Sequence, residues 1–154
     1  MRISDDLAHL LEGRPDVDSR EQAFPFLTVD EGGFPHVALL SRSEVDVTSS
    51  RSEILVAVAS VRTSANLRRS GKACLIVIDG ATAHYVKLRM LRTVEMDGML
   101  GAASEPVEHK RDSAGIPMEP ISFPTSAELA ELERWDTSAR VLLKLGLSSR
   151  RDPF

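Results

Sequence analysis

Two strand-like segments joined by a tight turn constrain the fold of this chain more than any other feature. The first, Lys72 to Ile78, is strongly apolar and runs into Asp79-Gly80, a favoured two-residue hairpin turn. In the second, Thr82 to Glu95, apolar and polar side chains alternate, which is typical of a strand with one buried face. Together these segments predict an antiparallel β-hairpin.

Further stretches also have the composition of strands. Phe24 to Asp30 is rich in aromatic and β-branched residues and leads through Glu31-Gly32-Gly33 into Phe34 to Ser41, which predicts a second hairpin. Glu53 to Ala59 is apolar on both faces, as expected of a strand inside a closed or packed sheet. Five or so mostly antiparallel strands with glycine-containing turns predict a mainly β (α+β) fold built on a small barrel.

Helical patterns occur in three places. Leucines at helical spacing predict one helix within residues 1–13, and a longer apolar stripe predicts another within residues 125–146. A short helix that ends at Gly71 is expected between the buried strand Glu53 to Ala59 and the strand that begins at Lys72, with Thr63 or Ser64 as its N-cap.

One stretch without clear periodicity remains. Residues 104–124 carry four prolines, and we predict a long loop there, which is either functional or simply disordered. The length of the chain suits a single domain, 1–154, with the barrel core at residues 20–95.

Composition excludes several classes of protein. A formal net charge of −4 argues against generic nucleic-acid binding, and no apolar run is long enough for a membrane helix. The first residues lack the apolar segment of a secretory signal, and the one cysteine, Cys74, cannot form an internal disulfide. A cytoplasmic protein with neither nucleic-acid nor membrane partners is therefore expected.

The segment Arg62-Thr63-Ser64 is the strongest candidate for a binding site. It lies between a buried strand and the start of a helix, and it offers a guanidinium, two hydroxyls and free backbone N–H groups. Helix N-termini bind anions through such N–H groups, and arginine suits the geometry of phosphate. In the alternative interpretation, Thr63 or Ser64 only caps the helix and Arg62 is a solvated surface residue.

No other set of side chains predicts a catalytic or metal site. The four histidines lack metal-like spacing with one another or with Cys74, so no metal is predicted. His36 either faces a ligand or serves the fold alone. Because the chain has no nucleophile elbow, Walker loop or dinucleotide fingerprint, its catalytic residues stay unassigned.

In the order and spacing of its motifs, the chain resembles the pyridoxamine 5′-phosphate oxidase-like, FMN-binding split-barrel family. The family commonly has a threonine-containing first strand, a Gly-x-Pro-x-hydrophobic second strand and an Asn-Leu-Arg-like segment before a hydrophobic strand. The matching stretches, all within residues 20 to 95, are Phe26 to Asp30, Gly33 to Ala38, Arg62 to Arg69 and Ala73 to Asp79. The resemblance implies a six-stranded antiparallel split β-barrel with flanking helices, a symmetric homodimer, and FMN in clefts at the dimer interface.

By this resemblance, Arg62 and Thr63 would contact the flavin phosphate, with Ser64 nearby. Thr63 stands where many relatives carry lysine, so one positive charge is missing from the expected phosphate site. The C-terminal arginine- and tryptophan-containing segment of the true vitamin B6 oxidases is not recognisable, which argues against that activity.

The resemblance also implies contacts with the rest of the cofactor. The backbone of Ala57, Val58 and Ala59 would lie against the flavin, although Ala57 lacks a hydroxyl that some relatives place there. His36 or Ala38 would approach the ring or the ribityl chain.

Three functions follow from these expectations. The first is an FMN-dependent oxidoreductase that acts on a small unidentified substrate, with deazaflavin as an alternative cofactor. The second is a flavin or haem binding protein, a carrier or sensor, without turnover. The third is a split barrel that has kept the dimer and lost its cofactor, and the missing lysine favours this one.

Overall fold

The computed structural model describes residues 1–113 and 115–150, with the backbone alone for Ser149 and Arg150. The predicted domain's last four residues lie outside the described part. The elements, in chain order, are α1 (Asp5–Leu11), β1 (Arg20–Gln22), β2 (Phe24–Val29), β3 (Pro35–Leu40), β4 (Val45–Val47), β5 (Ile54–Val58), α2 (Val61–Ser70), β6 (Lys72–Asp79), β7 (Thr82–Met96), β8 (Met99–Ser113), β9 (Ser122–Pro124), α3 (Ala127–Leu132) and α4 (Trp135–Arg150).

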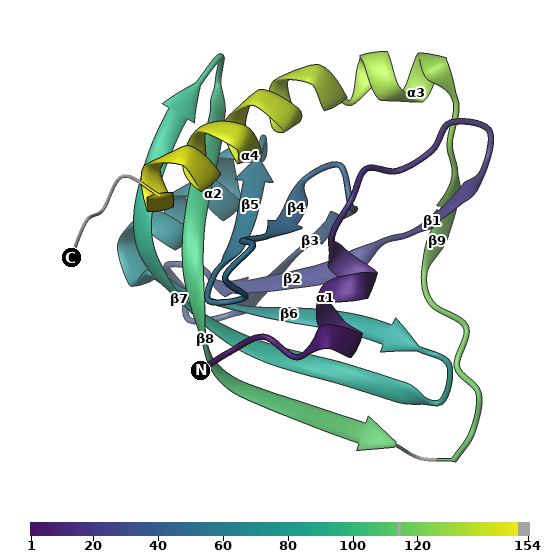
Figure 1. Ribbon diagram of the computed structural model, residues 1–154. Helices are drawn as coiled ribbons and strands as arrows, with labels where there is room; N and C mark the ends of the chain where they lie inside the picture. Colours follow the sequence, from purple (N-terminus) through teal and green to yellow (C-terminus); the bar gives the residue numbers. More distant parts are fainter. Residues whose placement is uncertain (114, 151–154) are drawn as a thin grey trace.

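A curled antiparallel sheet dominates the molecule (Figure 1). Seven strands pair in the order β3-β2-β6-β7-β8-β5-β4, and β1 and β9 form a separate two-stranded sheet. The mainly β split-barrel fold with flanking helices is thus confirmed, although the main sheet has seven strands rather than six. Both predicted hairpins are present, as β2–β3 and β6–β7.

The longest hairpin, β7–β8, was predicted only in part. Residues 104–113 belong to β8, so the predicted loop at 104–124 is wrong for this half, and β9 occupies part of the rest. Pro106 lies within β8, opposite Leu88, where the register shifts between Lys87 and Leu88. A proline is tolerated beside such a bulge because the ladder is already interrupted there. Because proline usually argues against a strand, the sequence pattern did not reveal the strand at residues 104–113.

Helix α2 begins and ends at residues with suitable capping chemistry. Ser60, and not Thr63 or Ser64, is the N-cap of α2, which ends at Gly71 in the left-handed conformation that glycine adopts freely. The single helix predicted over 125–146 is instead divided into α3 and α4. Arg134, with a φ of 57°, breaks it, because a continuous helix needs negative φ.

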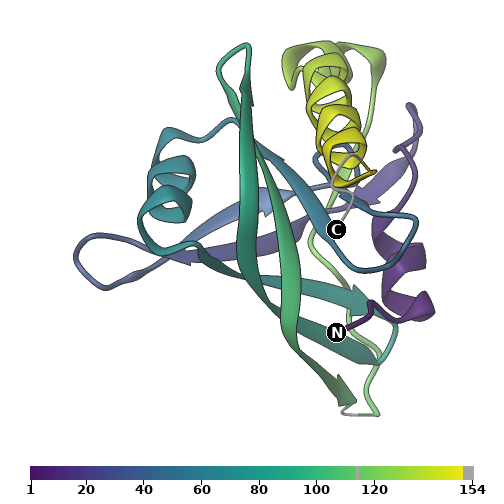
Figure 2. The same ribbon diagram turned by 60° about the vertical axis from the view of Figure 1, so that its left-hand side comes forward.

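Two apolar clusters stabilise the sheet. The larger fills the inside of the curl and includes Phe24, Phe26 and Leu75. The smaller lies between the sheet and α4, where Val141 and Leu145 pack on β5 and β8. Figure 2 shows the result, with α2 and α4 on opposite sides of the β7–β8 hairpin. Within the described residues, no helix is long and apolar enough to cross a membrane.

Candidate functional site

The N-terminal end of α2 presents donors to an anion. Strand β5 leads directly into Ser60, whose Oγ accepts a hydrogen bond from Thr63 N at 3.3 Å. Ser60 O accepts from Ser64 N at 3.0 Å, which starts the helical ladder. The N–H groups of Val61 and Arg62 lie in the first turn, where the helix offers no partner for them. The positive end of the helix dipole reinforces this preference for an anion.

Two of the predicted site residues add functional groups to this helix end. Thr63 is fully buried, and its Oγ1 has no hydrogen-bond partner among the described residues. A buried hydroxyl without a partner is uncommon, because desolvation costs free energy that only a hydrogen bond recovers. Arg62, one residue earlier, is exposed, so its guanidinium is free to turn toward a bound anion. The arrangement therefore suits a phosphate.

A cleft of about 420 Å³ lies beside this helix end, between α2 and the turn of the β7–β8 hairpin. Ala59 and Ser64 line it, together with Val61, Arg68 and residues 95–100, whereas Arg62 and Thr63 do not. Arg68 forms an ion pair with Glu95 across the cleft, which ties the helix to the hairpin.

Side chains of the recognised motifs hold α2 in place. Asn66 Nδ2 donates to Thr28 Oγ1 at 3.0 Å, and both residues are buried. Arg69 donates to Asn66 Oδ1 at 2.8 Å and to the carbonyl oxygen of Val29 at 2.6 Å. His36 is half-buried and lies directly opposite Thr28 in the β2–β3 ladder, on the strand face that bonds to α2. The threonine and asparagine of the resemblance are thus positioning residues for the helix.

The remaining two predicted residues lie deeper in the fold. Ala57 and Val58 are buried in β5, where Ala57 packs in the cluster against α4 and Val58 packs inside the curl. In the ladder with β8 they lie opposite Gly101 and Leu100, and on the other edge Ala57 N donates to Glu44 O. The structure therefore places the side chains of Ala57 and Val58 in the core and that of Ala59 in the cleft.

Sequence reasoning missed two parts of this site. Ser60 was detectable, since a serine directly after a buried strand is a favoured N-cap. The hairpin turn at residues 95–100 was not, because only the long-range pairing of β7 with β8 brings it to α2.

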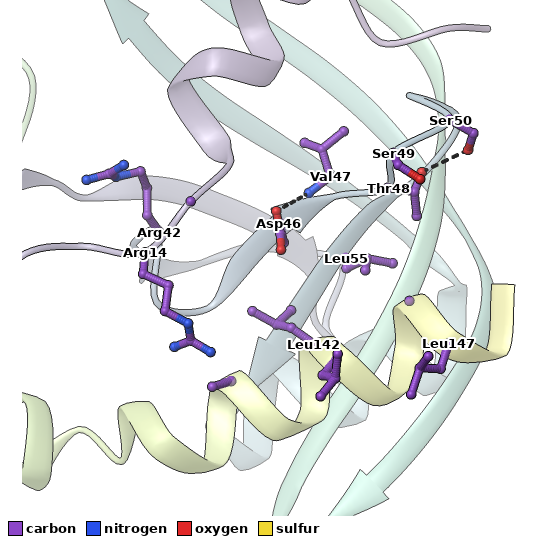
Figure 3. A pocket seen from close by; sticks show the side chains of 14 residues that line it. Arg14, Arg42, Asp46, Val47, Thr48, Ser49, Ser50, Leu55, Leu142 and Leu147 are labelled. Atoms are coloured by element: carbon purple, nitrogen blue, oxygen red, sulfur yellow. Dashed lines mark hydrogen bonds between the residues drawn. The ribbon is translucent and has the colours of Figure 1, made fainter. Parts of the chain in front are cut away.

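A larger cavity, of about 500 Å³, lies away from this helix end, and none of the predicted site residues line it. Figure 3 shows its two sides, with Thr48, Ser49 and Ser50 opposite leucines of α4. Arg42 also lines it, but its guanidinium is bonded to Glu21. The cavity mixes polar and apolar walls, and its other charged lining residues, Arg14 and Asp46, carry charges of opposite sign.

Titratable groups elsewhere in the described part of the chain do not form a catalytic cluster. Among residues 1–113 and 115–150, no three histidine, cysteine, aspartate or glutamate side chains are placed to hold a metal. Cys74 is half-buried, and burial raises the pKa of its thiol, which disfavours a reactive thiolate. His84 and His109 pair through their rings, with 2.8 Å between Nδ1 of His84 and Nε2 of His109.

The sequence was compared with family models and with curated proteins. No family model matches the chain. A curated relative, the uncharacterised protein YclD of Bacillus subtilis, is 39% identical over 87 residues. The chain spans 56% of that relative's length, and the match covers 56% of this chain.

Solved structures share the fold at low sequence identity. The styrene monooxygenase flavin reductase of Pseudomonas putida S12 has a TM-score of 0.54 at 12% identity, covering 68% of this chain and 86% of the reductase. Nitrilotriacetate monooxygenase component B of Mycobacterium thermoresistibile has a TM-score of 0.55 at 10% identity, covering 70% and 77%. An NADH:FAD oxidoreductase of Streptomyces globisporus has a TM-score of 0.53 at 11% identity, covering 70% and 83%. The chain thus has a fold that solved flavin reductases also have.

Proposed function

We propose that this protein binds FMN, with the phosphate at the N-terminal end of α2, and acts as a flavin-dependent oxidoreductase on a small substrate. The observation that carries the proposal is the buried Thr63 hydroxyl, which has no partner among the described residues and lies in the first turn of α2 beside Arg62. The fold shared with flavin reductases supports the choice of a flavin as the anion's source.

The residues at this helix end fit a phosphate group. Arg62 would supply the charge, Thr63 a hydroxyl donor, and the first-turn N–H groups two further hydrogen bonds. Because Thr63 occupies the position of the expected lysine, the site exchanges one charge for one hydroxyl. FMN would supply the redox chemistry when bound, whereas the protein binds and orients it and excludes water.

An exposed apolar face supports a homodimer. Val29, Val37 and Leu39 are 49%, 54% and 52% exposed, and the β2–β3 register puts them on one face of the sheet. Leu27 lies opposite Val37 in β3 and Cys74 in β6, so the apolar face continues across three strands. Contiguous exposed apolar surface marks an interaction site, and we propose a second copy of this chain as the partner.

The visible absorption spectrum of the purified protein tests the cofactor, followed by mass analysis of whatever is released. A flavin spectrum and the mass of FMN would support the proposal, whereas the mass of a deazaflavin would identify deazaflavin as the cofactor instead of FMN. Turnover with reduced nicotinamide then separates an enzyme from a carrier or sensor. If the protein is colourless and fails to bind added FMN, it is a split barrel that has lost its cofactor.

A further inference from the structure

A third cavity, of about 540 Å³, lies where the end of β3, strand β9 and the two C-terminal helices meet. Its walls are mainly apolar and include Ile121, Phe123, Leu129 and Trp135. Trp135 is only 8% exposed, so its ring is held firmly in the wall. None of the residues predicted to bind the flavin lines this cavity, but Leu39 of the exposed apolar face does, so the cavity adjoins the proposed dimer face.

One carboxylate in this apolar wall is fixed in position. Glu44 accepts a hydrogen bond from Ser43 Oγ at 2.9 Å through Oε1, and from Ser41 N at 3.2 Å through Oε2. A longer contact from Ser41 Oγ, at 3.4 Å, also reaches Oε1. These donors orient the carboxylate, while burial raises the pKa of Glu44.

Glu44 has no cationic partner among the residues that the structure describes. The nearest arginine in sequence, Arg42, instead forms a two-pronged ion pair with Glu21, at 2.7 and 2.9 Å. The other charged residue that lines the cavity, Glu133, is also acidic, and the lining contains no lysine, arginine or histidine. The cavity therefore combines apolar walls with uncompensated negative charge.

We propose that this cavity binds an organic cation with an apolar body, of the alkyl- or arylammonium class. The ammonium group would pair with Glu44, and the apolar body would pack against Trp135 and Phe123. A half-buried carboxylate attracts a cation more strongly than an exposed one does, because less water screens the charge. The proposal does not depend on flavin binding.

Trp135 provides the readout, since it is the single tryptophan of the chain. Its fluorescence would be followed while benzylammonium, benzyl alcohol or benzoate, which share one ring, is added to the purified protein. We expect benzylammonium to bind at least ~10-fold more tightly than benzyl alcohol, which corresponds to about 1.4 kcal/mol, and benzoate to bind most weakly. Equal affinities for benzylammonium and benzyl alcohol, or no change in fluorescence, would overturn the proposal.

Two variants assign the preference to this cavity. Glu44→Gln keeps the shape of the side chain and should abolish the preference for the cation while leaving benzyl alcohol binding unchanged. Glu131→Gln is the matched control, because Glu131 is exposed on α3 and does not line the cavity. Equal losses in both variants would mean that net charge alone attracts the cation, and the proposed site would be wrong.

A third variant keeps both carboxylates and guards against misfolding of Glu44→Gln. Ile121 is 55% exposed and lines the cavity, so Ile121→Lys adds a cation there at little cost to the core. It should weaken benzylammonium binding by about tenfold, since the lysine would compete for Glu44. Undiminished binding in this variant would contradict the proposal.

Discussion

At the scale of single residues, the charge on Arg62 is the first determinant to test. Arg62→Ala should weaken FMN binding by roughly ten- to a hundredfold, since a charge-assisted hydrogen bond contributes about 1.5–3 kcal/mol. The fold should remain intact, because Arg62 is exposed. Riboflavin, which lacks the phosphate, should bind wild type and variant alike, and titration of both ligands measures the difference. Equal losses for the two ligands would place Arg62 at the ring instead.

The hydroxyl of Thr63 makes a separate prediction, in which FMN binding weakens without any loss of stability. Thr63→Val preserves the shape of the side chain and removes an Oγ1 that has no partner among the described residues. The free energy of unfolding of the cofactor-free protein should stay constant or rise by about 1 kcal/mol, because an unsatisfied buried polar group is lost. FMN affinity should fall by about tenfold. Thr63→Ser, which keeps a hydroxyl, serves as the control.

The His84–His109 pair makes stability depend on pH. Burial lowers the pKa of both imidazoles, and Arg111 lowers them further, whereas Asp6 opposes the shift. Because the folded state resists protonation, these groups stabilise the fold above the ordinary histidine pKa of about 6.5. That contribution is lost as the pH falls from about 7 toward 5, so the melting temperature should decrease over this range.

Replacement of one imidazole isolates this effect from the carboxylates. His109→Gln keeps a group that can bond to His84 but removes one titration, so the decrease in melting temperature between pH 7 and 5 should be smaller. An unchanged pH dependence in this variant would show that other groups cause it.

At the scale of elements, the contact between β8 and α4 depends on one glycine. A Cβ on Gly101 would lie 2.5 Å from Val141 Cγ1, 2.9 Å from Val94 Cγ2 and 3.0 Å from Leu145 Cδ1. Gly101→Ala should therefore force α4 away from the sheet and lower the free energy of unfolding by about 1–3 kcal/mol, measured by chemical denaturation. Gly146→Ala is the matched control, since its nearest neighbour would be 4.0 Å away.

The control substitution should itself change the stability, in the opposite direction. Gly146 lies within α4, where alanine favours the helix by up to about 1 kcal/mol over glycine, so this variant should be slightly more stable than wild type. Destabilisation by both substitutions would mean that the α4 packing is not what Gly101 protects.

The elements that the sequence predicted well are those whose signals are local. Asp79-Gly80 and the alternation after it are enough to define β6–β7, and the all-apolar β5 identifies a strand with neighbours on both edges. Strand β8 escaped detection because Pro106 is a local signal against a strand, and only the pairing with β7 overrides it. The break at Arg134 was not predicted either, since arginine is a good helix former and neither glycine nor proline lies nearby in the sequence to signal a break.

In the candidate site, too, some features follow from local sequence and others depend on long-range packing. Arg62 and Thr63 were predicted because a helix start after a buried strand is a local pattern with a chemical meaning. The absence of a partner for Thr63 Oγ1 and the cleft formed with residues 95–100 depend on packing between distant segments, as does the cavity around Glu44. These three features therefore could not be predicted from the sequence alone.

At the scale of the whole molecule, the exposed face of β2 and β3 predicts the assembly. Static light scattering should give about twice the chain mass of 16.9 kDa, because burying Val29, Val37 and Leu39 against a second copy removes apolar surface from water. Val37→Lys places a charge in the middle of this face and should shift the protein toward the monomer. Leu132→Lys, at a side chain that is 76% exposed on α3, makes the same kind of change elsewhere and should leave the mass unchanged. If FMN lies at the dimer interface, Val37→Lys should also weaken FMN binding, although it leaves Arg62 and Thr63 untouched. A monomeric mass for the FMN-bound wild-type protein would contradict the proposed dimer.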